Sequence, residues 1–287
     1  MINKNLQLEL RNKFNPEDSD LRKMQLRMLS MLKYVDSICK DNNIKYWLSS
    51  GTCLGAVRHG GFIPWDDDVD IELEKNDFKK LCHILSNDNK FFLQNNRTDL
   101  EYLAPYAKLR DPHSYLKENN TNDLNYRFHG IYIDIFCIEP SSSLFITRIS
   151  SFIQYRLIFP LARIKNKILR QLLIKSIIPL THKGIFPLLS NLSKINNKGW
   201  YRHTLGSCFN ARRYRNDFES VKYVDFENTS LPIPINADQY LKKLYGNYEE
   251  LPPLENIHPH INKIIFYEND NVSLRDSSGS NQDGSSC

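Results

Sequence analysis

The chain has 287 residues, of which 41% are apolar and 25% are charged. This composition excludes a wholly disordered chain and is sufficient for one large globular domain or two small ones. The first residues lack the basic start, apolar run and cleavage site of a secretion signal, and the six scattered cysteines form no CxxC pair. We therefore expect a cytoplasmic protein with reduced thiols, and neither a disulfide framework nor a zinc knuckle.

The first predicted element is a helix over residues 21–40, because apolar residues recur there at helical spacing. They are Leu21, Met24, Met28, Leu32, Val35 and Cys39. Residues 44–50 then predict a strand, and Gly51 marks a turn into a short helix over residues 52–59. Gly60 and Gly61 follow that helix and are expected to close it.

Residues 68–73 predict a second strand, because acidic and apolar residues alternate strictly. Asp68, Asp70 and Glu72 would share one face of this strand. Carboxylates that point the same way repel each other unless a cation lies between them, and this is how a hard cation such as Mg²⁺ is usually held. A solvated edge strand with its acidic face in water is the alternative.

The turn before the helix at residues 52–59 has the features of a phosphate site. Ser50, Gly51 and Thr52 would present free backbone N–H groups and the positive end of a helix to an anion. Arg58, one to two turns along, would reach a phosphate or pair with the aspartates. The turn alone is a weak signal, but the neighbouring DxD strengthens it.

A third strand is predicted over residues 130–136, where Asp134 lies on the face opposite three isoleucines. A lone acid in such an apolar strand needs a partner, because burying an unpaired charge costs several kcal/mol. We predict a metal ligand or a general base at Asp134. A salt bridge to a nearby Lys or Arg is the alternative.

The net charge of +5 conceals an uneven distribution. Residues 141–216 contain fourteen Lys and Arg and no Asp or Glu. The segment is also apolar, but its uncharged runs are shorter than the roughly 20 residues of a membrane span, and Pro160, Pro179 and Pro187 interrupt it. We therefore expect no span, but short amphipathic helices lying on an anionic membrane surface.

The basic segment allows two other interpretations. An ordinary helical subdomain with a solvated basic face is the first. Nucleic acid is the second, and it is disfavoured because the segment has no interleaved stacking residues and no known nucleic-acid motif. The last residues, 269–287, are rich in Ser, Asn, Asp and Gly and are expected to form a disordered tail.

Four blocks of the sequence together resemble a known family. They are SGTCLGAVRHGGFIPWDDDVDIE at 50–72, KLRDPHSY at 108–115, GIYIDIFCIEP at 130–140 and DQYLKKLYGNYEELPP at 238–253. These blocks are similar to the LicD family of bacterial phosphocholine transferases, which resemble in turn the fukutin-related ribitol-phosphate transferases. The blocks occur in order between about residues 44 and 260, and the basic segment between them carries no such motif.

The resemblance implies an α+β protein with a nucleotidyltransferase-like core, a small mixed sheet with flanking helices, to which a basic helical membrane-associating segment is added. We expect the core in residues 1–140 and 217–268, with 141–216 as the insertion. The resemblance also implies a CDP-activated donor, CDP-choline above all, and a hydroxyl acceptor on a cell-surface glycan of the lipopolysaccharide, capsule or teichoic acid type. The expected location is the inner face of the plasma membrane.

The resemblance also implies roles for individual residues. Asp68 and Asp70 would hold Mg²⁺ or Mn²⁺, and Asp134 would complete the metal site or accept the proton of the attacking hydroxyl. The expected donor-binding residues are Ser50, Gly51, Thr52, Arg58, Lys108 and Arg110. Asp66 and Asp67 are expected to pair with Arg58 or His59 or to cap the turn. Trp65 is expected to anchor that turn. Glu72 is expected to be solvated or to support the metal ligands. The tyrosines of the YGNY motif at 245–248 would line the donor pocket.

Two other functions remain open from the residues alone. A nucleotidyltransferase with the same fold would release pyrophosphate from a nucleoside triphosphate instead of CMP from a CDP-alcohol. A non-catalytic adaptor would use only the basic segment, at a membrane. The sequence does not indicate which alcohol is carried or which glycan accepts it.

Overall fold

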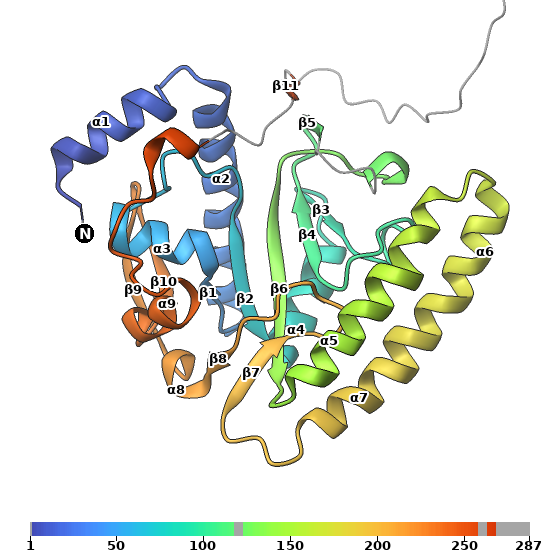
Figure 1. The fold of residues 1–287 in the computed structure, drawn as a ribbon. Coiled ribbons are helices and arrows are strands. Elements are labelled where there is room, and N and C mark those ends of the chain that lie inside the picture. The colour runs from blue at the N-terminus through green and yellow to red at the C-terminus, as the bar shows by residue number, and fades with distance from the viewer. Residues whose placement is uncertain (1, 118–122, 258–262, 268–287) are drawn as a thin grey trace, which may run out of the picture.

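The computed structural model describes residues 2–117, 123–257 and 263–267, and the predicted tail at 269–287 lies outside them. A mixed sheet forms the centre, with strand order β1-β2-β6-β4-β3, and β7 and β8 extend it from β6 (Figure 1). Its strands are β1 (Trp47–Leu48), β2 (Asp70–Glu74), β3 (Phe92–Gln94), β4 (Ala107–Arg110), β6 (Tyr132–Pro140), β7 (Trp200–His203) and β8 (Arg213–Tyr214). Helices flank this sheet, so the expected mixed α and β architecture is confirmed.

β6 is the central strand, and its two edges are used differently. It runs parallel to β2 and antiparallel to β4 and β7. Ile138 pairs with Glu74 of β2 and also with His203 of β7. A residue in a sheet has one paired neighbour on each edge of its strand, so β7 must lie on the edge of β6 opposite β2. β4 also lies on that edge. β4 and β7 therefore follow one another along the same edge of β6.

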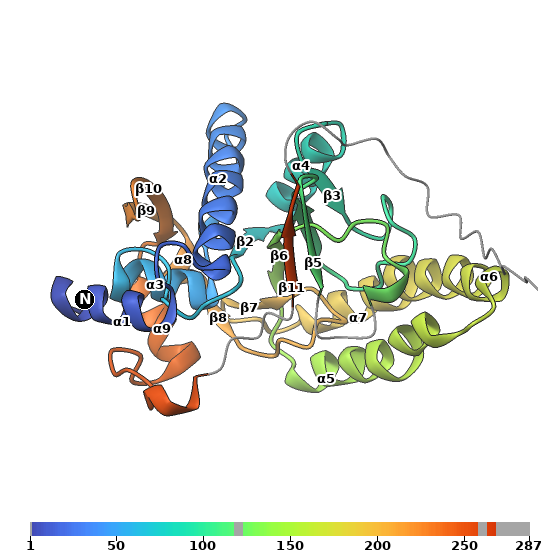
Figure 2. The same cartoon turned by 90° about the horizontal axis from the view of Figure 1, so that it is seen from above.

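The main core lies between the sheet and two long helices. The predicted N-terminal helix is confirmed as α2 (Asp20–Asp41), with Ser19 as its cap, and α4 (Lys75–Ser86) follows β2 directly. Both helices contact β6 (Figure 2). Apolar residues of α2 such as Met28 and Leu32 are fully buried with Ile133 and Ile135 of β6. The isoleucine face of β6 is thus the core face, and the face that carries Asp134 is left for other contacts.

The second helix that the sequence predicts is α3 (Ser50–His59). It ends at Gly60, which has a left-handed φ of 66° and donates its N–H to the Gly55 carbonyl. This glycine therefore closes the helix as expected. β1, α3 and β2 form a compact unit in which Ser49 N–H donates to the Asp70 carbonyl at 2.9 Å.

Smaller elements surround this unit. α9 (Ala237–Tyr245) packs against α3, and β10 packs against β1. The remaining elements on this side are α1 (Lys4–Phe14), α8 (Arg215–Phe218), β9 (Val221–Phe226), β10 (Thr229–Pro234) and the 3-10 turn Leu254–Asn256. A separate two-stranded sheet joins β5 (Ser114–Lys117) to β11 (Lys263–Phe266), and a short 3-10 turn spans Asp123–Asn125.

The basic segment folds into two antiparallel helical arms, which we call the basic hairpin (residues 144–193). The first arm joins α5 (Leu144–Ile153), a π-helical turn (Gln154–Ile158) and a 3-10 turn (Phe159–Arg163). The second arm joins α6 (Lys167–Ile178), a π-helical segment (Pro179–Ile185) and α7 (Phe186–Ser193). The arms share a small core of their own that includes Ile158, Ile174 and Phe186.

The expectation that prolines would divide this segment into short helices is wrong for the second arm. Residues 167–193 form one continuous helix of 27 residues. Pro179 starts the π-helical segment, where the ordinary hydrogen-bond ladder is replaced, and Pro187 follows directly where that segment gives way to α7. After Ser193 the chain returns to the sheet as β7 and β8, although the charge pattern continues to Asn216.

Candidate active site

A row of polar side chains crosses the sheet at the level of Asp134. Asp70 of β2 is directly opposite Asp134, and Lys108 of β4 is directly opposite it on the other side. Residues paired in this way point to the same face of a sheet. Lys108 Nζ lies 3.1 Å from Asp134 Oδ1. The fold thus brings together three residues predicted from separate blocks of sequence, and we call them the polar row.

A hydrogen bond connects the first turn of α3 to the start of β2, beside the polar row. The Asp70 backbone N–H donates to Thr52 Oγ1 at 2.8 Å. A Cβ on Gly51 would lie 3.0 Å from Asp66 Oδ2, so the glycine allows this carboxylate to approach the helix. Ser50, with a φ of 47°, turns the chain into the helix. The positive end of α3 therefore faces the carboxylates, as the phosphate-site hypothesis requires.

Negative charge accumulates around Asp70. Burial, together with Asp68 and Asp134, raises the pKa of Asp70 well above its ordinary value. Burial, Asp68 and Asp67 do the same to the pKa of Asp66. Each ionised carboxylate therefore opposes the ionisation of the next. A cation placed among them would stabilise all of them in the charged form.

The strand that carries the DxD pair begins later than its alternation predicts. β2 starts at Asp70 and continues to Glu74, so Asp68 precedes the regular strand. The pairing nevertheless extends back one step, because Asp134 N–H donates to the Val69 carbonyl at 2.7 Å. Asp68 is thus held next to the row by the chain and acts on Asp70 through its charge.

Glu72 is neither solvated nor at an edge, which corrects one of the two expectations for it. It is fully buried, and its Oε1 accepts from the Arg213 guanidinium at 2.5 Å and lies 2.7 Å from His203 Nε2. Its Oε2 accepts from the Tyr240 hydroxyl at 3.1 Å and from the Trp47 indole at 3.2 Å. Burial alone would raise the pKa of Glu72, but Arg213 and His203 lower it to about 2. Sequence reasoning identified none of these partners.

The two arginines predicted to bind phosphate, Arg58 and Arg110, donate hydrogen bonds to other residues of the protein. Arg58 Nη1 donates to the backbone carbonyls of Tyr248 at 2.7 Å and Glu250 at 2.9 Å. Arg110 donates from Nε to Gln94 Oε1 at 2.7 Å and from Nη1 to the Gly130 carbonyl at 2.9 Å. Arg58 therefore anchors the loop after α9, whereas Lys108 is the predicted cation that contacts Asp134 within the polar row.

An aromatic pocket of about 440 Å³ opens beside the α3 terminus. Gly51, Trp65, Asp66, Tyr245 and Glu250 are among the residues that line it. Burial raises the pKa of Tyr245, and the charges of Asp70 and Asp66 raise it further, so this phenol lies close to the carboxylates. The pocket therefore lies beside the polar row, and Tyr245 and Tyr248 of the YGNY motif line it.

The chemistry of the carboxylates fits a hard cation. Asp68, Asp70 and Asp134 offer only oxygen atoms, which Mg²⁺ prefers. Within the residues that the structure describes, no three His, Cys, Asp or Glu side chains are already arranged as a metal site. Mg²⁺ is commonly held by one or two carboxylates together with substrate phosphates and water, so a preformed cage of three side chains is not required.

Comparison with known proteins identifies the family of this site. Residues 43–172 match the family model described as LicD/FKTN/FKRP, nucleotidyltransferase domain. The lipopolysaccharide cholinephosphotransferase LicD of Haemophilus influenzae is 26% identical over 271 residues, which cover 84% of this chain and 95% of that protein. The matched range contains the polar row, the first turn of α3 and the DxD pair.

Shorter matches include the following two proteins. An uncharacterized protein of Rickettsia prowazekii is 48% identical over 63 residues, which cover 22% of this chain and 24% of that protein. The human ribitol 5-phosphate transferase FKRP is 44% identical over 45 residues, or 16% of this chain and 9% of that protein. The chain therefore carries a LicD-family nucleotidyltransferase domain and is homologous to LicD cholinephosphotransferase and to the ribitol 5-phosphate transferases.

Proposed function

We propose that this protein transfers a phosphorylated alcohol from a CDP-activated donor to a hydroxyl of a cell-surface glycan and releases CMP. The observation that carries the proposal is the polar row beside the first turn of α3, which joins carboxylates, an ammonium group and a positive helix end. Phosphoryl transfer is catalysed mainly by positioning and by stabilising charge, and these groups suit that task. The named homologues LicD and FKRP are phosphotransferases, in agreement with this reaction class.

We propose that Asp70 and Asp134, with Asp68 in support, hold Mg²⁺ or Mn²⁺. When bound, such a cation would neutralise charge on the donor pyrophosphate. The N–H groups at Gly51 and Thr52 would bind phosphate oxygens at the α3 terminus. As an alternative to binding the metal, Asp134 would accept the proton of the acceptor hydroxyl, and Lys108, whose Nζ lies 3.1 Å from Asp134 Oδ1, would hold the carboxylate in position.

The aromatic pocket favours a cationic alcohol such as choline. Trp65 and Tyr245 supply aromatic faces, and Glu250 and Asp66 supply carboxylates, that of Asp66 being charged when a metal cation lies among the aspartates. A quaternary ammonium group binds to aromatic faces through cation–π attraction and to carboxylates through charge. Ribitol and glycerol are neutral and would gain nothing from these charges. CDP-choline is therefore the donor that we propose.

The reaction is tested by incubating the purified protein and Mg²⁺ with a panel of CDP-alcohols and measuring CMP. We expect CMP release with CDP-choline and its loss in Asp70→Asn, while Asp225→Asn, an exposed aspartate of β9, keeps the activity. Failure of every CDP-alcohol, with pyrophosphate released from a nucleoside triphosphate, would instead identify a nucleotidyltransferase. Absence of both activities, with vesicle binding retained, would favour the adaptor.

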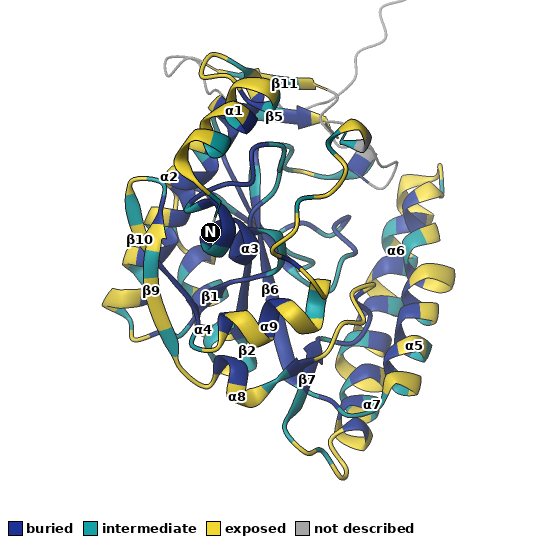
Figure 3. Cartoon of the chain, turned by 60° about the vertical axis from the view of Figure 1, so that its left-hand side comes forward, coloured by how far each residue is buried: buried dark blue, intermediate teal, exposed yellow. Residues whose placement is uncertain are grey.

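We also propose that the basic hairpin places the enzyme on an anionic membrane surface. Many of its large apolar side chains are exposed, and Figure 3 shows exposed residues, in yellow, along the helices of the hairpin. They include Phe145, Phe152, Leu157, Ile168, Leu172, Leu180, Leu188 and Leu192. Phe145 is 73% exposed and Ile168 is 74% exposed, which is costly in water but favourable among lipid headgroups and chains.

The membrane proposal is tested by vesicle flotation of the full-length protein. We expect binding to vesicles that contain phosphatidylglycerol, weaker binding to phosphatidylcholine alone, and loss of binding in a Phe145→Ser/Phe152→Ser variant. Among the described residues, Lys167–Ser193 is the one helix long and apolar enough to cross a membrane, and only 22% of its most apolar window is buried. Resistance to carbonate extraction after expression in cells would indicate a span and contradict surface binding.

A further inference from the structure

A second cavity lies away from the polar row, between the catalytic core and the basic hairpin. Its volume is about 610 Å³, which is within the range of small-molecule sites. It adjoins β6 at Cys137 and Glu139, on the α4 face, whereas Asp134 points to the opposite face. We call it the basic cavity.

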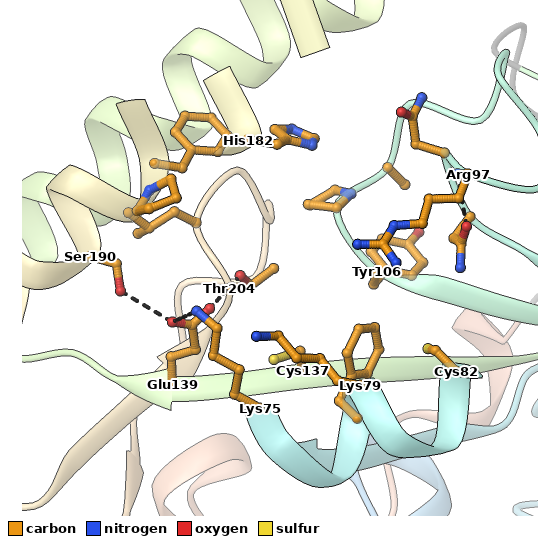
Figure 4. Close-up of a pocket in the computed structure, with 18 of the residues that line it drawn as sticks. Lys75, Lys79, Cys82, Arg97, Tyr106, Cys137, Glu139, His182, Ser190 and Thr204 are labelled. Atoms are coloured by element: carbon orange, nitrogen blue, oxygen red, sulfur yellow. Dashed lines mark hydrogen bonds and ion pairs between the residues drawn. The ribbon is translucent and has the colours of Figure 1, made fainter. Parts of the chain in front are cut away.

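The cavity occupies a gap in the sheet. β4 and β7 follow one another along one edge of β6, and their pairing covers Tyr132–Ile135 and then Ile138–Pro140. Tyr106, just before β4, and Thr204, just after β7, line the cavity on either side of this interval. α4 forms one wall, and the second arm of the hairpin, at His182, Phe186 and Ser190, forms the other (Figure 4).

Positive charge predominates on the walls. Lys75 and Lys79 extend from α4, and Arg97 extends from the loop after β3 (Figure 4). Lys75 is neutralised by Glu139, whose Oε2 lies 2.9 Å from its Nζ. In the part of the chain that the structure describes, the Lys79 and Arg97 side chains make no ion pair, so the cavity has an excess of two positive charges. Burial lowers the pKa of His182 to about 4, so its imidazole is neutral at pH 7.

Hydrogen bonds between the walls of the cavity hold them in place. The buried Glu139 carboxylate accepts from Lys75 of α4, from Thr204 Oγ1 at 2.9 Å and from Ser190 Oγ of α7 at 3.2 Å. One side chain thus ties together α4, the β7 end and the hairpin. The loop that carries Arg97 is fixed by Asn95 Oδ1, which accepts from the Arg97 N–H at 2.9 Å. A preformed site of this kind binds with a smaller loss of entropy than a flexible one.

We propose that the basic cavity binds a ligand that bears a phosphate or diphosphate group, at a site separate from the polar row. Lys79 and Arg97 would contact the phosphate oxygens, with the arginine fork suited to two of them. Phe78, Tyr106 and Phe186 line the remaining space and would contact an apolar or ring portion of the ligand. The phosphate is either that of a soluble metabolite or that of a lipid headgroup, since the hairpin forms one wall. This inference does not depend on the proposed reaction.

The test measures binding to the full-length Asp70→Asn protein in EDTA, so that neither turnover nor metal contributes. The probes are inorganic pyrophosphate and dihexanoylphosphatidic acid, a short-chain lipid phosphate, each followed by calorimetry. We expect Lys79→Ala/Arg97→Ala to weaken binding by about tenfold or more, because two charge-assisted contacts are lost. Binding of pyrophosphate indicates a soluble ligand, and binding of the lipid alone indicates a headgroup.

Two matched variants decide whether the cavity itself is responsible. Lys80→Ala/Arg127→Ala removes the same two residue types from exposed positions outside the cavity, and it should bind as the parent does. Ala104→Trp keeps every charge but fills the cavity, and it should also lose binding. Loss of affinity that is equal in both double variants, or full binding by Ala104→Trp, would overturn the proposal. So would the absence of binding by either probe to the parent protein.

Discussion

Asp70 and Asp134 lie directly opposite each other on adjacent parallel strands, and Lys108 contacts Asp134 from the far side. The two carboxylates share one face of the sheet, so a charge on one opposes a charge on the other. Burial and the neighbouring acids raise the pKa of Asp70 well above its ordinary value. The protein thus maintains an electrostatic arrangement that costs stability, which is common where a site is built for function.

Replacing Asp70 with Asn should abolish activity and yet stabilise the fold. We expect CMP release to fall by about 100-fold or more. Because folded Asp70 binds its proton more tightly than unfolded Asp70, the wild type loses stability as the pH rises from the ordinary carboxyl pKa toward the folded one. In EDTA at pH 7, the variant should therefore melt at a higher temperature, by about 3 °C for each kcal/mol gained.

Two comparisons test that explanation. The two melting temperatures should converge as the pH is lowered below about 3, because the Asp70 carboxyl is then mostly protonated in both states of the wild type. Added Mg²⁺ should raise the melting temperature of the wild type and leave that of Asp70→Asn nearly unchanged. A variant less stable than the wild type at pH 7 in EDTA would show that repulsion is not the dominant effect at Asp70.

The parts of this site that were predictable are those with a local signal. The spacing of Met28 and Leu32 predicts α2, and the alternation through Asp70 predicts β2, because secondary structure follows short-range periodicity. Asp134 was identified because a single acid stands out in an apolar strand. That Asp70 and Asp134 would be neighbours depended on the family resemblance, since strand order is not a local property.

The parts that were missed depend on contacts between distant segments. Glu72 meets His203 and Arg213, 131 and 141 residues away in sequence, and no local pattern connects them. The sequence predicts a phosphate contact for Arg58 because it is a cation near a glycine turn. Its guanidinium instead donates to backbone carbonyls of the loop after α9. Pro179 was expected to break a helix, and a π-helical segment accommodates it instead.

Glu72→Gln should destabilise the protein strongly, because Arg213 would lose a buried charged partner. We expect a loss of about 3 kcal/mol in the free energy of unfolding at pH 7, measured with urea. Since the pKa of Glu72 is lowered to about 2, its stabilising contribution is present above the ordinary glutamate pKa and disappears as the pH falls through 2. The difference between wild type and variant should shrink accordingly.

The control for Glu72 is its neighbour Glu74. Glu74 lies on the same strand but is partly exposed and pairs with Lys45 at 3.0 Å. Exposed ion pairs contribute little, so Glu74→Gln should cost less than about 1 kcal/mol. Equal losses for the two variants would argue that the charge of β2, rather than the buried network, determines the effect.

Gly51→Ala should reduce activity more than stability. Its Cβ would meet Asp66 Oδ2 at 3.0 Å, so the carboxylate must move by a few tenths of an ångström at the α3 terminus. We expect kcat to fall by about tenfold or more, because small displacements of positioning groups are costly in catalysis. Gly184→Ala is the matched control, since an added Cβ there meets nothing within 4 Å. If both variants kept full activity, the close approach of Asp66 would have no catalytic role.

Arg58→Lys should weaken donor binding while leaving the chemical step largely intact. Arg58 Nη1 donates to the Tyr248 and Glu250 carbonyls and so holds the loop that lines the aromatic pocket, while Nε donates to His59 Nε2 at 3.0 Å. The single ammonium nitrogen of a lysine cannot occupy both nitrogen positions and therefore cannot make all three contacts. We expect KM for the CDP-alcohol to rise by about tenfold, with kcat changed by less than about threefold, because binding rather than transition-state stabilisation is lost. Steady-state kinetics measures this split. Arg170→Lys, which alters a buried contact between the hairpin and Glu101 of the segment before β4, should leave KM unchanged. A fall in kcat at constant KM would instead place Arg58 against the transferring phosphate.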